Sequence, residues 1–153
     1  MSDPKSSPEQ LSDYSRGLDR FSDPKLTEQW LERIVGPETR NQDAAGYLGR
    51  LLENPAAQKM AWDWTKQHWT EISGKLTAGS GAAIVNATSH FCSADMRNEV
   101  EQFFTDHRVA ETNRSLKQSV EMMNTCIHFQ ADQQPNLTAW LEQHAVNASA
   151  GAR

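Results

Sequence analysis

At 153 residues, the chain has the length of one domain and can bury roughly two thirds of the surface that it exposes when unfolded. A net charge of −5, with lysines and arginines scattered along the chain, argues against a nucleic-acid-binding protein, which needs a clustered basic face. The sequence holds no apolar stretch long enough to span a membrane, and its opening, MSDPKSSPEQ, lacks the apolar core of a signal peptide. Composition therefore predicts a soluble chain and leaves its compartment open.

Helix signals recur along the whole chain. Ser7-Pro8, Asp23-Pro24 and Asn54-Pro55 each place an N-cap residue before a proline, which is tolerated at the first helical position because its missing N–H would be unpaired anyway. Apolar residues then recur at spacings of three and four, as on one face of a helix. In chain order, helices are predicted from Pro8 to Phe21, Pro24 to Val35, Asp43 to Asn54, Pro55 to about Leu76, about Ala82 to His90, Ser93 to Phe104, Leu116 to Ile127, and Pro135 to Leu141.

These eight predicted helices are joined by short turns, and the sequence shows no β alternation. The pattern predicts an all-α fold in which antiparallel helix pairs stack as a HEAT- or armadillo-like α-solenoid. Residues 1–7 are predicted to form a disordered lead, residues 8–144 a single helical-repeat domain, and residues 145–153 a frayed tail.

Three tryptophans fall within eight positions of the predicted helix over residues 55–76. On one helix, Trp62 and Trp69 share an apolar stripe, and Trp64 lies on a second stripe beside it. A platform for nucleic acid or sugar would leave such rings exposed among basic residues, and only two lysines lie nearby. The tryptophans are therefore predicted to be core. The full predicted core is Trp30, Trp62, Trp64, Trp69, Phe103, Phe104, Leu116 and Trp140.

The same segment, NPAAQKMAWDWTKQHWTEI, resembles a helix in the C-terminal helical domain of the aminopeptidase N family of zinc metallopeptidases, which includes the endoplasmic-reticulum aminopeptidases. Further segments resemble that domain in the same order: FSDPKLTEQWLERIV, ETRNQDAAGYLGRLLENP with the turn motif Arg40, Gln42 and Asp43, CSADMRNEVEQFFTDH, and RSLKQSVEMMNTCIHF with LTAWLEQH. The resemblance implies an array of HEAT-like repeats that encloses the substrate chamber and helps it to open and close.

The family's reaction needs zinc held by a His-Glu-x-x-His motif and a downstream glutamate. The sequence has no such motif, because no two of its five histidines lie four positions apart. His68 and Glu71 would supply two ligands at most, and an interfacial histidine near a solvated glutamate is the simpler interpretation. The resemblance therefore implies no cofactor in this chain, a zinc ion in an absent catalytic domain, and no peptide hydrolysis by the chain alone.

Cys92 precedes the helix predicted after Ser93, and Cys126 lies inside the next predicted helix. If these helices form an antiparallel hairpin that turns near Arg108, position 124 lies opposite Cys92 and close to Cys126, so that a disulfide is possible. It would contribute roughly 3–4 kcal/mol in an oxidising compartment. Two buried thiols in a reducing compartment are an equal alternative. A zinc site that adds His90 and His128 is disfavoured, because residues two apart on a helix point about 200° apart.

Two functions are compatible with these patterns. The first is a non-catalytic C-terminal domain of a zinc aminopeptidase, with the catalytic domain of the same parent chain and a peptide at the concave face as its partners. The alternative is an independent helical-repeat scaffold that binds a protein or a peptide, which needs a polar cap at each end. A domain cut from its parent should instead expose an apolar patch around Leu11, Leu18 and Leu26 and self-associate through this N-terminal edge.

Overall fold

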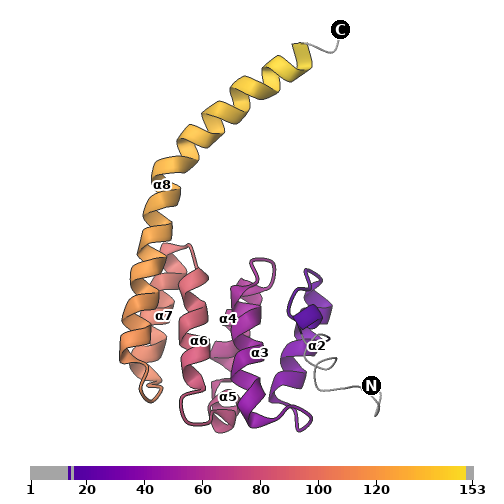
Figure 1. Cartoon of the computed structure of the whole chain (residues 1–153), viewed down its shortest axis with the longest axis vertical. Coiled ribbons are helices and arrows are strands. Elements are labelled where there is room, and N and C mark those ends of the chain that lie inside the picture. The colour runs from indigo at the N-terminus through magenta and orange to yellow at the C-terminus, as the bar shows by residue number, and fades with distance from the viewer. Residues whose placement is uncertain (1–13, 15, 151–153) are drawn as a thin grey trace.

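The structure, a computed structural model, describes residue 14 and residues 16–150, with side chains as far as His144. Within these residues every element is helical and no strand occurs, which confirms the all-α prediction. After a helical stretch at residues 16–18, the elements in chain order are α2 (Pro24–Val35), α3 (Asn41–Glu53), α4 (Gln58–Gln67), α5 (Trp69–Lys75), α6 (Gly81–Ala87), the 3₁₀ turn η1 (Thr88–His90), α7 (Ala94–Asp106) and α8 (Asn113–Ala150) (Figure 1).

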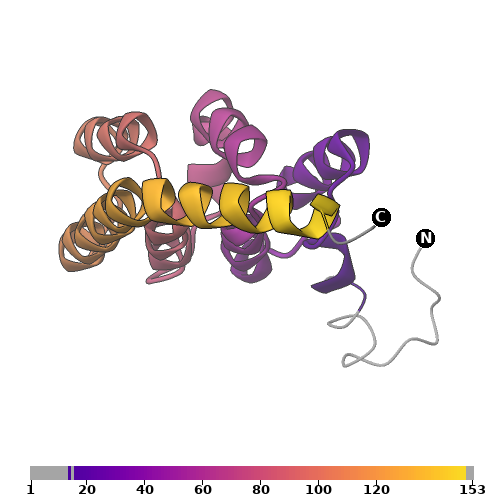
Figure 2. The same ribbon diagram turned by 90° about the horizontal axis from the view of Figure 1, so that it is seen from above.

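The helices stack in chain order as two rows. Seen end on, α2, α4 and α7 form one row, and α3, α6 and the first part of α8 form the other (Figure 2). Within the second row α3 packs on α6 and α6 packs on α8, while α2 contacts α4 within the first row and α3 across the rows. The core lies between the rows. Its largest fully buried side chains are Trp62, Phe91, Leu31, Ile34, Leu48, Leu51, Leu52, Ile84 and Met123.

A glycine sets the closest approach within the second row. Gly49 of α3 faces α6, and a Cβ atom added there would lie only 3.2 Å from the carbonyl oxygen of Ala83. The missing side chain therefore lets the two helix backbones come together.

The start of α2 follows the sequence prediction. Asp23 is the N-cap, its carboxylate accepts hydrogen bonds from the backbone N–H groups of Lys25 and Leu26, and Pro24 occupies the first helical position. The helix ends at Val35, where the backbone N–H of Gly36 bonds back to the carbonyl groups of Glu32 and Arg33.

The segment predicted as one helix over residues 55–76 is two helices. Asn54 ends α3, and residues 55–57 form a turn before α4 begins at Gln58. His68, with φ −108° and ψ 24°, then separates α4 from α5. The side-chain amide of Asn54 donates to the carbonyl groups of Asp19 and Phe21, so it joins the end of α3 to the loop before α2. The single-helix prediction is therefore wrong, although the two short helices remain adjacent.

The two helices predicted at the C-terminal end are instead one. α8 runs through Pro135 to Ala150, so the tail predicted to fray from residue 145 is helical as far as residue 150. From His128 to His144 every side chain is exposed, and Trp140 is 54% exposed. The prediction that Trp140 belongs to the core is therefore wrong. Figure 1 shows this part of α8 leaving the body and curving beyond it.

The N-terminal edge is described only in part. The predicted lead over residues 1–7, Leu11 and most of the helix predicted after Pro8 lie outside the described residues. Leu18 is partly buried against the core, whereas Leu26 is 40% exposed. Across the part of the chain that the structure describes, no helix combines the length and the apolar character needed to cross a lipid bilayer.

Candidate functional site

An aromatic cluster centred on Trp62 lies between α4 and α7. Trp62 is fully buried in α4, and its ring centre lies 5.7 Å from that of Phe91, 5.2 Å from that of Phe103 and 5.9 Å from that of Phe104. The first two contacts are edge-on, an arrangement that aromatic pairs favour. The cluster therefore fastens α4 to α7 and to the segment before it.

The other predicted core residues lie around this cluster or beside it. Trp69 is partly buried and meets the ring of Phe103 edge-on at 5.2 Å. Trp64 is partly buried and stacks on His68 at 4.3 Å. Trp30 is buried and lies 5.3 Å from the ring of Tyr47, and Leu116 packs on the core from α8. None of these rings forms an open platform for a ligand.

Beside the aromatic cluster, four charged side chains form a chain of ion pairs that we call the Glu99 cluster (Lys59, Asp63, Lys66 and Glu99). The indole N–H of Trp62 donates to Glu99 at 3.1 Å, and Lys66 bonds to the same carboxylate. Lys66 also lies 3.0 Å from Asp63, which pairs with Lys59. The cluster links α4 to α7 at the rim of the core.

These contacts shift the pKa values within the Glu99 cluster. The hydrogen bond from Lys66 lowers the pKa of Glu99 against the effect of partial burial, and the bond from Trp62 adds to the decrease. Partial burial raises the pKa of Asp63, but hydrogen bonds from Lys59 and Lys66 outweigh it and the net pKa is lowered. Partial burial lowers the pKa of Lys66, while its bonds to Glu99 and Asp63 raise it overall. The contacts therefore favour the charged forms of Glu99, Asp63 and Lys66.

A buried carboxylate, which the sequence did not single out, holds the N-terminal edge together. Asp19 is 3% exposed, and it accepts a hydrogen bond of 2.8 Å from the indole N–H of Trp30. Its second oxygen pairs with the guanidinium group of Arg50 in α3. Both oxygens are thus satisfied, as a buried carboxylate requires. The loop before α2, α2 itself and α3 meet at this one side chain.

The predicted turn motif is a surface ion pair. The helix predicted to begin at Asp43 begins at Asn41, with Arg40 as its N-cap and Asp43 in its first turn, and the Arg40 side chain makes no capping bond. The guanidinium group of Arg40 donates to Asp43 at 2.6 Å, which raises its pKa, and the Arg40 side chain is 72% exposed. Gln42 is exposed. The motif therefore closes a turn and presents no enclosed site.

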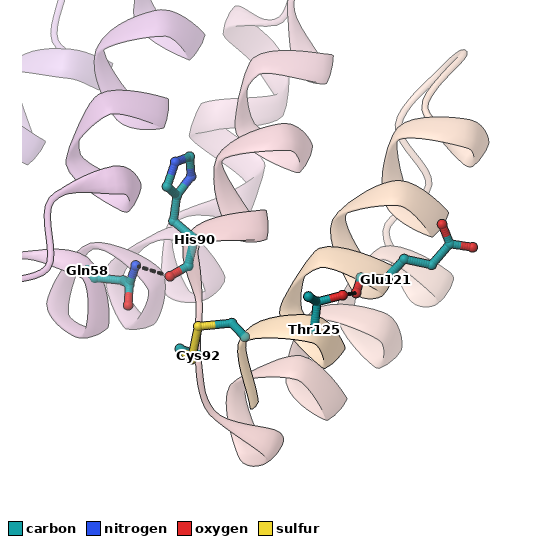
Figure 3. Close-up of a disulfide and its surroundings, with 6 residues drawn as sticks. Gln58, His90, Cys92, Glu121 and Thr125 are labelled. Atoms are coloured by element: carbon teal, nitrogen blue, oxygen red, sulfur yellow. Dashed lines mark hydrogen bonds between the residues drawn. A yellow bond between two sulfur atoms is a disulfide. The ribbon is translucent and has the colours of Figure 1, made fainter. Parts of the chain in front are cut away.

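Cys92 and Cys126 form a disulfide with their Cα atoms 5.4 Å apart (Figure 3). The bond ties the segment between η1 and α7 to α8. On one side of it, the side chain of Gln58 donates to the carbonyl group of His90, and on the other the hydroxyl of Thr125 donates to the carbonyl group of Glu121. His90 and His128 are not brought together with the cysteines as metal ligands, because both sulfur atoms are in the bond.

The described residues contain no group of three or more histidine, cysteine, aspartate or glutamate side chains placed to hold a metal ion. His68, the C-cap of α4, stacks on Trp64 of the same helix. The aromatic cluster, the Glu99 cluster, Asp19 and the disulfide therefore hold neighbouring helices in contact, because their side chains bind one another.

The fold and these contacts define a helical stacking domain whose successive helices are tied together by aromatic, ionic and covalent links. A comparison with family models matches residues 2–125 to the ERAP1-like C-terminal domain, and the chain belongs to this family. The resemblance read from the sequence is thereby confirmed.

Three similar proteins are aminopeptidases of much greater length. The chain is 32% identical to aminopeptidase M1 of Arabidopsis thaliana over 82% of its residues, and 31% identical to endoplasmic reticulum aminopeptidase 2 of Bos taurus over 76%. It is 29% identical to the mitochondrial aminopeptidase 2 of Saccharomyces cerevisiae over 80%. The matched region is only 12–14% of the length of these relatives.

Proposed function

We propose that the chain is the non-catalytic C-terminal domain of a zinc aminopeptidase and that it encloses the chamber in which a peptide loses its N-terminal residues. The observation that carries this proposal is the match of residues 2–125 to the ERAP1-like C-terminal domain. The catalytic domain, and the zinc ion that would activate water for peptide hydrolysis, belong to the part of the parent protein outside this chain.

The links between neighbouring elements support a role as a wall, because a wall must keep its shape while the enzyme works. Lys75, at the end of α5, donates to the carbonyl groups of Gly36 and Thr39 in the loop between α2 and α3. Ser119 of α8 donates to the carbonyl group of Val85 in α6 at 2.9 Å. Together with Asp19 and the disulfide, these bonds join elements that are far apart in the sequence at both ends of the body.

The exposed N-terminal edge supports a partner on that side. Leu26 lies on the outer helix α2 and is 40% exposed, and Tyr14 before it is 64% exposed. An apolar edge of this kind is suited to packing against a further domain of the same parent chain. The catalytic domain is the proposed occupant.

The test compares the parent enzyme with a version from which residues 1–153 are deleted, and then adds the chain back as a separate polypeptide. The substrates are an amino-acid anilide and a series of peptides of increasing length. We expect the chain alone to release no amino acid from either substrate. We expect the deleted enzyme to lose its discrimination between short and long peptides more than its activity on the anilide, and the added chain to restore it.

Unchanged dependence on peptide length in the deleted enzyme would contradict the proposal. So would tight binding of the isolated chain to an unrelated protein with no affinity for the rest of the parent, since this would favour an independent scaffold. The zinc content of the two polypeptides gives a separate readout, because the metal should remain with the catalytic part.

A further inference from the structure

The part of α8 beyond the body is an amphipathic helix without a partner in the described residues. From His128 to His144 every side chain is exposed. Four large apolar residues of α8 share one side, which we call the α8 stripe: Met122 is 61% exposed, Phe129 65%, Leu137 58% and Trp140 54%. At 100° per residue, Met122, Phe129 and Trp140 fall within about 20° of one direction and Leu137 within about 60° of it. A stripe of this kind is unusual on a helix that contacts only water.

The α8 stripe is complementary to itself in the antiparallel direction. Phe129 and Leu137 each lie four positions from Gln133, Cys126 and Trp140 each lie seven positions from it, and Met122 and His144 each lie eleven positions from it. Steps of four, seven and eleven keep every residue on one helix face. Two antiparallel copies of α8 with a twofold axis at Gln133 therefore place Phe129 against Leu137 and Met122 against His144, and bring Trp140 to the level of Cys126, whose sulfur is bonded to Cys92.

We propose that two copies of the chain pair through the α8 stripe, antiparallel, about a twofold axis at Gln133. Such an interface is isologous, with the same surface used by both copies. Because α8 is helical through residues 131–135, its own C-terminal part points away from Met122 and Phe129 and cannot cover them, whereas the self-complementary spacing of the α8 stripe suits a second copy. Most of the pairing segment lies beyond residue 125, where the family match ends, and the proposal does not rest on the proposed enzyme role.

The charges along α8 allow this pairing. After Lys117 the helix carries no lysine or arginine, and its acidic residues are far apart. In the proposed register Glu142 lies opposite Asn124, and Asp132 lies opposite Gln134, so that no carboxylate faces another. A polar residue at the axis, here Gln133, is a device that fixes register in paired helices.

The first test is sedimentation equilibrium of the full chain over a series of concentrations. The native chain should dimerise, and Trp140→Asp should weaken the dimer roughly tenfold or more, because a central tryptophan commonly dominates an interface. Thr138→Asp, on the same helix but on the opposite face, is the matched control and should leave the dimer unchanged. Far-ultraviolet circular dichroism shows whether each variant keeps its helices.

The second test uses a single new thiol, since both native cysteines are in the disulfide. Gln133→Cys should form a covalent dimer on mild oxidation, because the two copies of residue 133 meet at the axis. Thr138→Cys should not, because its two copies lie on the outer faces. These two variants test the register itself.

Three outcomes would overturn the proposal. The first is a monomer at all concentrations with no covalent Gln133→Cys dimer. The second is a monomer in which Trp140 is shielded from a fluorescence quencher, because α8 would then fold back on itself at residues 131–135. The third is a dimer that survives Trp140→Asp but is lost with Leu26→Asp, because association would then use the N-terminal edge.

Discussion

At the scale of single residues, Trp62 is the largest fully buried side chain among the described residues. It has no exposed surface, contacts three phenylalanine rings and donates to Glu99. Trp62→Ala should lower the free energy of unfolding by about 3–5 kcal/mol, because it leaves a cavity that the neighbours cannot fill. Urea denaturation followed by circular dichroism measures this loss.

The exposed Trp140 supplies the control for this experiment. At a protein concentration low enough for the chain to be monomeric, Trp140→Ala should change the free energy of unfolding by less than about 0.5 kcal/mol. Equal losses for the two substitutions would contradict the assignment of Trp62 to the core and of Trp140 to the surface.

Asp19 provides a second test at this scale. Asp19→Ala leaves the indole N–H of Trp30 and the guanidinium group of Arg50 without this acceptor, and should lower the free energy of unfolding by about 1–3 kcal/mol. Asp19→Asn keeps an oxygen for Trp30 and should lose less. Thermal unfolding of the two variants side by side gives the difference, and an asparagine variant as unstable as the alanine variant would show that the bond to Trp30 contributes little.

Sequence patterns identify the aromatic residues at this scale better than the polar ones. Trp62 stands on an apolar face, and such faces are buried because they exclude water. Asp19 looks like any charged residue before a helix. Its partners lie 11 and 31 positions away, and only the packing of α2 against α3 brings them together. The Glu99 cluster escaped prediction for the same reason.

At the scale of elements, the disulfide is the covalent link that holds α8 on the body. It closes a loop between residues separated by 34 positions, so its loss frees a large part of the unfolded chain. Cys126→Ser should lower the free energy of unfolding by roughly 3–4 kcal/mol under oxidising conditions. A reductant should destabilise the native chain by a similar amount and leave the serine variant unchanged, as chemical denaturation with and without the reductant would show. Equal stability of both chains under oxidising conditions would contradict this.

The helix boundaries show where local sequence patterns are not enough to predict the start or end of a helix. Asp23-Pro24 predicted the start of α2 because its capping bonds are local. Asn54-Pro55 has the same form, and the side-chain oxygen of Asn54 accepts from the backbone N–H of Ala56, but residues 55–57 form a turn and α4 begins only at Gln58. Pro135 predicted a helix start, whereas α8 continues through it. A proline loses one backbone hydrogen bond and can bend a helix without ending it.

At the scale of the whole molecule, the all-α class and the family were both accessible from the sequence. The class follows from helix signals repeated along the chain, and the family from several segments that occur in a fixed order. The sequence did not predict that the C-terminal part of α8 leaves the body. Leu137, Trp140 and Leu141 have the spacing of a packed face, and sequence alone does not say whether the chain itself or another molecule covers that face.

The pH dependence of stability is a further property of the whole molecule, and the Glu99 cluster sets it on the acid side. The pKa values of Glu99 and Asp63 lie below their usual 4.5 and 3.8, so both carboxylates favour the folded state when they are charged. This contribution is present above these values and is lost as the pH falls and the folded-state carboxylates take up protons. Lys66, whose pKa is raised, loses its contribution only in strong alkali.

Lys66→Met removes a cation that lowers the pKa values of both Glu99 and Asp63. Because the pairs are partly exposed, the variant should lose only about 0.5–1 kcal/mol of unfolding free energy near neutral pH. The difference from the native chain should shrink as the pH falls below the usual pKa of glutamate, since the native pairs are then lost as well. Urea denaturation of both chains from neutral to acid pH measures this difference in stability. Lys117→Met, at an exposed site of α8, is the control. A difference that grows in acid would show that these carboxylates do not stabilise the fold through Lys66.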